Sequence, residues 1–251
     1  MATLVVNVGN TSLFCGVFAA ERAPRVFRLA VDASVRLPAR VRGRIERAAV
    51  SSVVPGLTPA VLRLIRRTWA VEPAVLTATA AHGLKIGYRM PGQLGADRVA
   101  AALGARTLYP RRHVIVVDCG TATTVTALRA DGTVAGGAIF PGLKLAAESL
   151  ARGTAQLPAA NVHRPRAALG RSPREGIASG CYFGQLGAIK EVVARVRREA
   201  FGRAAAVVLG TGGGAAAFER EGIFEAVVPD LVLRGLAFFA GRGGGRPPEP
   251  S

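Results

Sequence analysis

The hydrophobic and polar positions of this chain form two similar series, and each begins with a short β-branched run that ends in a small polar cluster. The first run covers residues 4–8 and meets the polar cluster at 9–11, and an apolar run at 13–18 predicts a β-hairpin around this turn. The pattern restarts with a strand at 114–118, followed by a hairpin through 133–139. The chain therefore suggests two halves of related design.

The remaining apolar periodicity predicts strands at 26–31, 73–76 and 204–209, an apolar run at 47–54, and helices at 57–69, 97–107, 143–152, 174–200 and 230–240. Strands in a row followed by helices, repeated twice, favour an α/β fold with two lobes of mixed sheets flanked by helices over one continuous parallel sheet. We place the N-terminal lobe at 1–112 and the C-terminal lobe at 113–240. The Gly- and Pro-rich segment 241–251 is expected to be a disordered tail.

The composition fits a folded enzyme rather than a disordered or nucleic-acid-binding chain. Half of the 251 residues are hydrophobic, so the chain can bury a real core. The formal net charge of +17 comes almost entirely from arginines, which are dispersed and not interleaved with aromatic residues as in a nucleic-acid-binding stripe. We therefore expect no specific nucleic-acid partner, although the charge should attract anionic substrates such as ATP.

Cysteine spacing and hydropathy favour a cytoplasmic protein. No metal-binding or redox spacing is present among the three cysteines, Cys15, Cys119 and Cys181, which is typical of a reduced compartment. The apolar stretch at the N-terminus lacks a basic flank and is interrupted by polar residues, unlike a signal peptide. No apolar run is long enough to span a membrane. We therefore expect no membrane partner.

Both turns combine the residue types that bind phosphate. Each strand ends in an acidic residue or its amide, Asn7 in the first turn and Asp118 in the second, followed by one spacer, a glycine and hydroxyl or amide side chains. Such a turn offers backbone N–H groups to an anion, and the glycine lets phosphate approach the backbone closely. A carboxylate at the strand end can hold a hydrated Mg²⁺. Two such turns suggest duplicated halves that face each other across a nucleotide cleft.

Asp97 is a candidate catalytic residue in the polar segment 87–98 between the two turns. It stands at the start of a predicted helix, where its structural role would be an N-cap that accepts backbone N–H bonds. Its functional role would be a base near the phosphate turns, with Arg98 beside it to bind an acidic substrate. The spacing alone leaves both interpretations open.

Three glycines of the long predicted helix, Gly180, Gly184 and Gly187, lie on one helix face. Small residues on one face allow close helix–helix approach. This approach could take place inside the lobe or across a dimer seam, and the sequence does not distinguish the two.

A glycine motif after the strand at 204–209 offers a rival interpretation. Residues 210–215 match the dinucleotide fingerprint G-x-G-x-x-A, and Asp230 lies at a suitable distance downstream. The predicted helix at 215–220 is short, however, and the motif stands too near the end of the chain for a second mononucleotide-binding half. A nicotinamide or flavin enzyme is therefore the weaker hypothesis, and no P-loop motif occurs.

An ordered set of motifs resembles one known family. The motifs are N-V-G-N-T at 7–11, G-A-D-R at 95–98, D-C-G-T-A-T at 118–123, G-G-A-I-F-P-G at 136–142 with L-A-R-G-T-A-Q-L-P at 150–158, and G-R-S-P-R-E-G-I-A-S-G at 170–180. The chain thus resembles the type III pantothenate kinases of the acetate and sugar kinase/Hsp70/actin superfamily, from about Leu4 to Phe239. A single motif would be weak support, whereas this order is specific.

The resemblance implies a fold and an activity. Two actin-like (ribonuclease H-like) lobes are expected, in a homodimer that phosphorylates pantothenate with ATP and thereby opens coenzyme A synthesis. The family uses Mg²⁺ or a similar divalent cation and is stimulated by K⁺ or NH₄⁺. In this interpretation the glycines at 210–215 pass close to the adenosine of ATP.

The resemblance also implies roles for residues at matching positions. ATP would be bound by Asn7, Val8, Gly9, Asn10, Thr11, Ser12 and Thr121. Pantothenate would be bound by Tyr88, Gly95, Ala96, Asp97, Arg98 and the position of Pro173. Asp97 would accept the proton of the attacking hydroxyl, and Asp118 would coordinate the monovalent cation.

Three positions depart from the family pattern. Asn7 replaces an aspartate and so removes a negative charge that would face Mg²⁺ and its waters, a loss typically worth roughly 10–100-fold in affinity or activity. Ser12 replaces an asparagine, which is a milder change. Pro173 replaces a threonine that holds pantothenate, although Ser172 is adjacent. Because Tyr88, Asp97, Arg98, Asp118 and Thr121 all remain, we favour an active or weakened kinase. The departures at Asn7 and Pro173 and the basic charge support the alternative, a non-catalytic regulatory protein that binds nucleotide or pantothenate.

Overall fold

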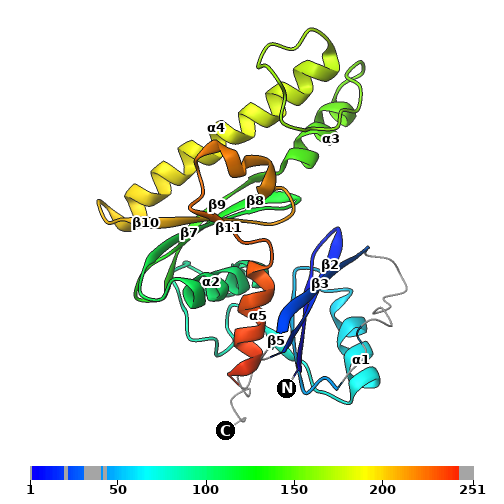
Figure 1. Ribbon diagram of the computed structural model, residues 1–251, viewed down its shortest axis with the longest axis vertical. Coiled ribbons are helices and arrows are strands. Elements are labelled where there is room, and N and C mark those ends of the chain that lie inside the picture. The colour runs from blue at the N-terminus through cyan, green and yellow to red at the C-terminus, as the bar shows by residue number, and fades with distance from the viewer. Residues whose placement is uncertain (1, 20–21, 31–40, 42–43, 243–251) are drawn as a thin grey trace. The chain divides into compact units, whose positions relative to one another are not determined.

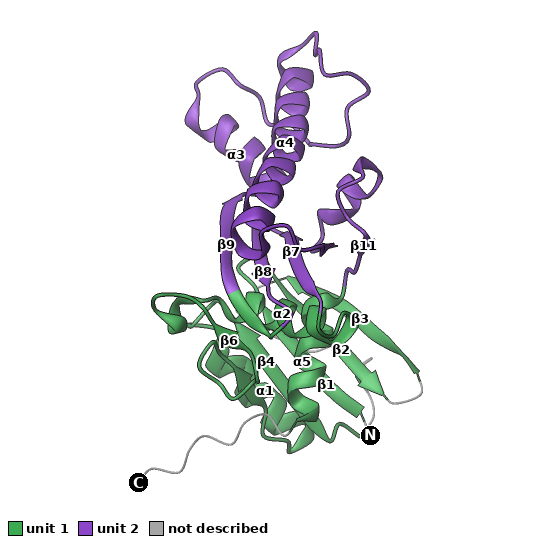
Figure 2. Ribbon diagram, turned by 90° about the vertical axis from the view of Figure 1, so that its left-hand side faces the viewer, with its two compact units in different colours: residues 1–111, 131–134, 230–251 green, residues 112–130, 135–229 purple. Residues whose placement is uncertain are grey.

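The computed structural model describes residues 2–19, 22–30, 41 and 44–242 of the chain (Figure 1). The described residues belong to two compact units. The first comprises residues 1–111, 131–134 and 230–251, and the second comprises residues 112–130 and 135–229, with the undescribed positions excepted (Figure 2). No helix in the described ranges is long and apolar enough to cross a membrane.

The first unit is built on a five-stranded mixed sheet. Its strands are β1 (Ala2–Val8), β2 (Ser12–Ala19), β3 (Arg22–Ala30), β4 (Arg47–Ser52) and β5 (Ala74–Leu76), in the order β3-β2-β1-β4-β5. The central strand β1 pairs antiparallel with β2 and parallel with β4. The parallel pairing brings the C-terminal ends of β1 and β4 to the same edge of the sheet, where Asn7 is paired in register with Ser51.

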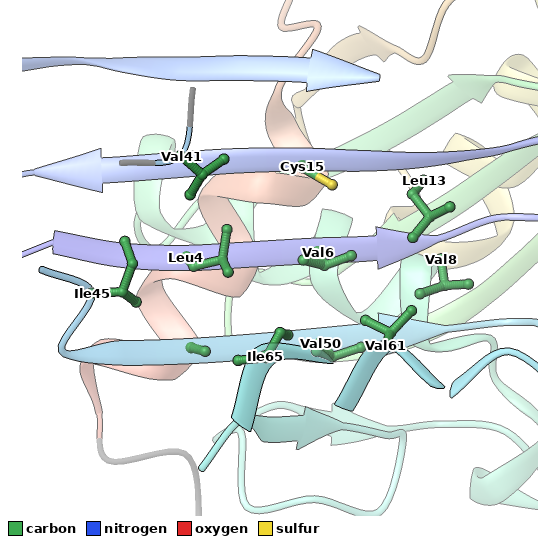
Figure 3. Close-up of a cluster of buried hydrophobic side chains, with 11 residues drawn as sticks. Leu4, Val6, Val8, Leu13, Cys15, Val41, Ile45, Val50, Val61 and Ile65 are labelled. Carbon is green, nitrogen blue, oxygen red and sulfur yellow. The ribbon is translucent and has the colours of Figure 1, made fainter. Parts of the chain in front are cut away.

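Helices cover both faces of this sheet. Alternate β1 residues Leu4, Val6 and Val8 form a buried cluster with Val61 and Ile65 of α1 (Thr58–Trp69), as period-2 and i, i+4 spacing require (Figure 3). Two further helices, α2 (Ala96–Leu108) and α5 (Leu231–Gly241), pack against each other and contact β4.

Two glycines allow α2 and α5 to approach closely. A Cβ on Gly104 of α2 would collide with the backbone of Leu231, and a Cβ on Gly235 of α5 would collide with the backbone of Ala100. This contact explains why the segment after 230 groups with the first unit, whereas the sequence analysis placed 230–240 in the C-terminal lobe. Of the expected tail 241–251, only Gly241 and Arg242 lie within the described residues.

The second unit contains most of a six-stranded mixed sheet. Its strands are β7 (His113–Cys119), β8 (Ala122–Leu128), β9 (Thr133–Pro141), β10 (Ala206–Thr211) and β11 (Ala226–Val227), and β6 (Lys85–Ile86) pairs with the start of β9 at residues 133–134. The order is β11-β10-β7-β8-β9-β6. The strand β7 pairs antiparallel with β8 and parallel with β10, as β1 does with β2 and β4.

The two sheets therefore repeat one topology. Read from β3 to β5, the first sheet has the same order as the second read from β9 to β11, with β1 equivalent to β7 and β4 equivalent to β10. The α/β class with two duplicated mixed sheets flanked by helices, expected from the sequence, is confirmed.

The second unit has its own helices and core. The helix α3 (Leu143–Gly153) follows β9, and the long helix α4 (Pro173–Phe201) precedes β10. The 3-10 helix η2 (Ala215–Glu221) follows β10. One more 3-10 helix, η1 (Pro91–Gln93), belongs to the first unit. Ile115 and Val117 of β7 pack with Tyr182 and Ile189 of α4 and with Phe218 of η2. This packing anchors the strand that contains Asp118 near its C-terminal end.

Candidate active site

The first phosphate-type turn, residues 9–11, joins β1 to β2. The Gly9 N–H donates to the carbonyl oxygen of Ser12 at 3.1 Å, which closes the turn, and an added Cβ at Gly9 would lie 3.2 Å from that oxygen. Asn10 and Thr11 at the tip are exposed, and Val8 before them is buried. A closed turn with an exposed polar tip is suited to bind an anion through backbone and side-chain donors.

The end of β4 and the loop after it are joined to the end of β1 by two hydrogen bonds. The Ser51 hydroxyl donates to Oδ1 of Asn7 at 2.8 Å, and the Val53 N–H donates to the Val8 carbonyl at 3.0 Å. Ser51 is fully buried. A serine hydroxyl has one proton to donate, and Ser51 donates it to Asn7. The side-chain oxygen of Asn7 therefore has its hydrogen-bond partner inside the sheet.

Asp97 is held at the same region of the first unit. It is the second residue of α2, whose N-cap is Gly95, so it is not the N-cap residue that one sequence interpretation expected. Its Oδ1 accepts the Arg98 N–H at 2.8 Å. A Cβ at Gly95 would lie 2.6 Å from that oxygen and 4.0 Å from Cγ1 of Val53, so the start of α2 lies against the loop that is bonded to Val8.

Burial changes the acidity of Asp97. Removal of the carboxyl from water raises its pKa, and the hydrogen bond from the Arg98 backbone and the charge of Arg98 oppose this rise without cancelling it. A carboxylate with a raised pKa is a better proton acceptor than an exposed aspartate.

Arg98 and Tyr88 form a second polar group in the first unit. Nη1 of Arg98 donates to the Tyr88 hydroxyl at 2.6 Å, and the guanidinium carbon lies 5.8 Å from the tyrosine ring centroid. The arginine is buried, which orients the guanidinium. The structure thus brings together Tyr88, Arg98 and, by adjacency in α2, the residues Gly95, Ala96 and Asp97 expected at the pantothenate site.

The second phosphate-type turn joins β7 to β8 in the second unit. The Gly120 N–H donates to the Ala122 carbonyl at 3.2 Å, and both Gly120 and Thr121 are exposed. Two glycine segments hold the turn in place. The Gly142 N–H donates to the Thr121 carbonyl at 3.0 Å, and the Gly214 N–H donates to the Cys119 carbonyl at 2.8 Å.

Glycine is required at both of these segments because the backbones approach closely. A Cβ at Gly142 would collide with the carbonyl of Gly120, and a Cβ at Gly212 would collide with the Asp118 carboxylate. Gly212 also has φ +81°, which disfavours other residues. Both glycines belong to motifs of the sequence, but only the structure shows that they lie against the second turn.

Asp118 is the residue that the sequence offers as a cation ligand. Its carboxylate is partly buried beside a turn of backbone carbonyl and N–H groups, and this oxygen-rich surrounding fits a hard cation. The described residues contain no cluster of three or more His, Cys, Asp or Glu side chains that could hold a metal by itself. A single carboxylate at this position suits a cation whose other ligands come from phosphate and water.

The glycine loop at 210–215 does not form a dinucleotide-binding helix. It leads from β10 into the 3-10 helix η2 and then into β11, so no α-helix N-terminus follows the motif. The loop instead packs on the second turn, through Gly212 and Gly214. The fingerprint match is therefore a consequence of close packing, not of pyrophosphate binding by a helix.

Pro173 opens α4 in the second unit, while the other residues expected to bind pantothenate lie in the first. Proline is favoured in the first turn of a helix. The Ser172 hydroxyl accepts the Glu175 N–H at 3.3 Å, and Oε2 of Glu175 accepts the Arg171 N–H at 2.7 Å. Ser172 and Glu175 thus form a helix cap, which accounts for Pro173 as a helix-start residue.

Solved structures with the same architecture show the fold of this protein. A Campylobacter jejuni protein described as a Baf family transcriptional activator matches with a TM-score of 0.63 at 17% identity, over 96% of this chain and 98% of that one. A Sinorhizobium meliloti protein described as a 2-dehydro-3-deoxygalactonokinase matches with a TM-score of 0.57 at 15% identity, over 96% and 98%. The fold is that of the actin-like kinases with two related lobes.

Sequence comparison then identifies the family. The model of the type III pantothenate kinases matches residues 3–195. A type III pantothenate kinase of Legionella pneumophila is 36% identical over 249 residues, which cover 94% of this chain and 97% of that protein. The chain belongs to the type III pantothenate kinase family.

Proposed function

We propose that this protein transfers the γ-phosphoryl group of ATP to pantothenate and forms 4'-phosphopantothenate, the first step of coenzyme A biosynthesis. The observation that carries this proposal is the partly buried Asp97 carboxylate, which lies at the start of α2 against the loop that is hydrogen-bonded to Val8, the residue before the first phosphate-type turn. A phosphoryl transfer needs positioned phosphates and a proton acceptor more than covalent chemistry. Family membership supports the same reaction.

Asp97 and Arg98 divide the work on pantothenate. The Asp97 carboxylate accepts the proton of the attacking hydroxyl, which its raised pKa favours. The Arg98 guanidinium, oriented by the Tyr88 hydroxyl, binds the carboxylate of the substrate in a charge-assisted pair. Gly95 and Ala96 let the substrate approach the start of the helix, because neither has a large side chain.

Each turn has donors for a nucleotide phosphate. In the first unit, backbone and side-chain donors of residues 7–12 bind phosphate oxygens. In the second unit, the exposed Thr121 offers a hydroxyl to ATP. A divalent cation such as Mg²⁺, bound with ATP, supplies charge neutralisation to the phosphates. Asp118 is suited to a monovalent cation, K⁺ or NH₄⁺. Such a cation binds its ligands weakly, so a single carboxylate together with backbone carbonyls is enough to hold it.

A homodimer in the cytoplasm is part of the proposal. The face of α4 that contains Gly180, Gly184 and Gly187 has open space at each glycine, so within the described residues it is not used for close packing. The neighbouring Phe183 is 37% exposed. An open small-residue face beside an exposed aromatic side chain supports helix–helix contact with a second copy.

The test is ADP release by the purified protein with and without pantothenate, at saturating Mg·ATP and K⁺, with the product identified by mass spectrometry. We expect ADP release that requires pantothenate and one added phosphate on the product. Nucleotide binding by calorimetry is measured in parallel. Binding of ATP and pantothenate without turnover would overturn the kinase assignment for this chain and favour a regulatory protein.

A further inference from the structure

The pair formed by Asn7 and Ser51 fixes the orientation of the Asn7 amide. The two residues are neighbours in register on the parallel strands β1 and β4, and the Ser51 hydroxyl donates to Oδ1 of Asn7 at 2.8 Å. Ser51 is fully buried, so water cannot replace this partner. The amide oxygen of Asn7 is therefore used inside the sheet.

The reverse orientation of the amide would leave a buried proton without an acceptor. If Nδ2 of Asn7 faced Ser51, the serine hydroxyl would need another acceptor, and its hydrogen bond in the structure is the one to Asn7. An unsatisfied buried hydroxyl is unfavourable. Among the described side chains, only Nε of Arg197 is buried without a hydrogen-bond partner, so the orientation with Oδ1 toward Ser51 satisfies this pair.

The two N–H groups of Asn7 are consequently directed elsewhere. Among the described residues, no acceptor is bonded to Nδ2, and Asn7 is partly exposed at the end of β1, next to the turn at 9–11. An amide donor beside a turn of backbone N–H groups adds to a site for an anion.

We propose, on the basis of the function proposed above, that Asn7 donates directly to a phosphate oxygen of the bound nucleotide and that the first turn does not use a divalent cation at this position. An aspartate held by Ser51 in the same way would present a second carboxylate oxygen instead of the NH₂ group. That oxygen repels phosphate unless a cation or its waters lie between them. Asn7 thus sets how strongly nucleotide affinity depends on divalent metal.

Calorimetry with the non-hydrolysable ATP analogue AMP-PNP tests this assignment. The Kd is measured with Mg²⁺ and with EDTA for the parent protein and for Asn7→Asp, and the ratio of the two Kd values gives the benefit of metal. We expect this ratio to be about tenfold larger or more in Asn7→Asp, since an outer-shell metal partner is worth roughly 10–100-fold.

The matched control is Asn161→Asp, which adds the same charge at an exposed loop position. Its ratio should equal that of the parent. The proposal would be overturned if the ratio of the Kd in EDTA to the Kd with Mg²⁺ differed by less than twofold between the parent and Asn7→Asp. In that case the parent would lose as much affinity in EDTA as the variant does.

A second variant keeps the test decisive if Asn7→Asp does not fold, as judged by circular dichroism. Ser51→Ala leaves Asn7 in place but removes the bond that orients it. We expect it to weaken AMP-PNP binding in EDTA by about threefold or more, while the exposed control Ser149→Ala leaves it unchanged. Unchanged binding by Ser51→Ala would contradict the proposal.

The outcome is separable from that of the kinase assay. A parent protein that binds AMP-PNP with the expected metal ratios but does not phosphorylate pantothenate would refute the proposed function and leave the role of Asn7 intact. If the protein phosphorylates pantothenate but the benefit of Mg²⁺ to AMP-PNP binding is the same in the parent and in Asn7→Asp, the proposed function stands and the role of Asn7 is refuted.

Discussion

The two phosphate-type turns end equivalent strands of two sheets with the same order, yet their strand-end residues differ in charge. Asn7 of β1 is in register with Ser51 of β4, and Asp118 of β7 is in register with Thr211 of β10. The backbone of both turns is closed by a glycine N–H bond to a carbonyl across the turn. The two turns therefore share their backbone hydrogen bonding and differ in the side chain that precedes the turn.

The surroundings of the two strand ends explain how this difference is tolerated. In the first unit the Ser51 hydroxyl satisfies the amide oxygen of Asn7, so a neutral residue is stable there. In the second unit the carboxylate of Asp118 lies against Gly212, where the absence of a Cβ leaves room for it. We infer that the first turn ends in a neutral side chain suited to donate to an anion and the second in a charged side chain suited to a cation.

The largest effect should come from Asp97, the proposed base, which lies in the first unit. We expect Asp97→Asn to reduce kcat by about 10²–10⁴-fold, because the attacking hydroxyl loses its proton acceptor. The variant should fold, since an asparagine oxygen can still accept the Arg98 N–H. Turnover is measured by ADP release, and pantothenate binding by calorimetry should be nearly unchanged. Parental turnover would reduce Asp97 to a first-turn residue of α2.

The elements with clear periodicity were predictable from the sequence. The first hairpin, the strand at 114–118 and the helices at 57–69 and 97–107 lie within one or two residues of the observed elements. Alternating or i, i+4 apolar residues determine these elements locally, as in the cluster of Leu4, Val6 and Val8 with α1. The family was also predictable, because its motifs occur in one order.

Features that depend on distant contacts were not predictable. The two-residue strands β6 and β11 exist only through their partners β9 and β10. The grouping of α5 with the first unit depends on close contact with α2, which no local pattern reports. The hydrogen bond from Ser51 to Asn7 joins residues 44 positions apart. The orientation of the Asn7 amide could therefore be obtained only from the structure.

Conversion of the second turn to the chemistry of the first is expected to have the next largest effect. Asp118→Asn removes the charge that we propose holds the monovalent cation, and we expect turnover to fall by roughly 10–100-fold with most of the stimulation by K⁺ lost. The measurement is kcat over a K⁺ titration. Glu199→Gln, which removes one exposed negative charge on α4, should behave as the parent. Full stimulation by K⁺ in Asp118→Asn would show that the two turns do not differ in this respect.

The smallest expected effect is that kcat depends on pH through Asp97, whereas nucleotide binding by the turns does not. Burial raises the pKa of Asp97 above its ordinary value of 3.8. Because the base must be ionised, kcat should fall about tenfold per pH unit below the raised pKa and reach a plateau above it. Binding of AMP-PNP, which rests on the neutral Asn7 and on backbone donors, should not follow this titration.

The stability of the protein should respond to Asp97 in the opposite sense. The fold disfavours the ionised carboxylate, so the contribution of Asp97 to the free energy of unfolding is complete below its pKa in the unfolded chain and is lost as the pH rises through its raised pKa in the fold. Above that pKa, Asp97→Asn should therefore melt no lower than the parent. Thermal melting and kcat measured over the same pH series check both signs. A kcat midpoint at or below that of an ordinary aspartate would remove Asp97 from the role of base and leave the first turn without the proton acceptor that distinguishes it from the second.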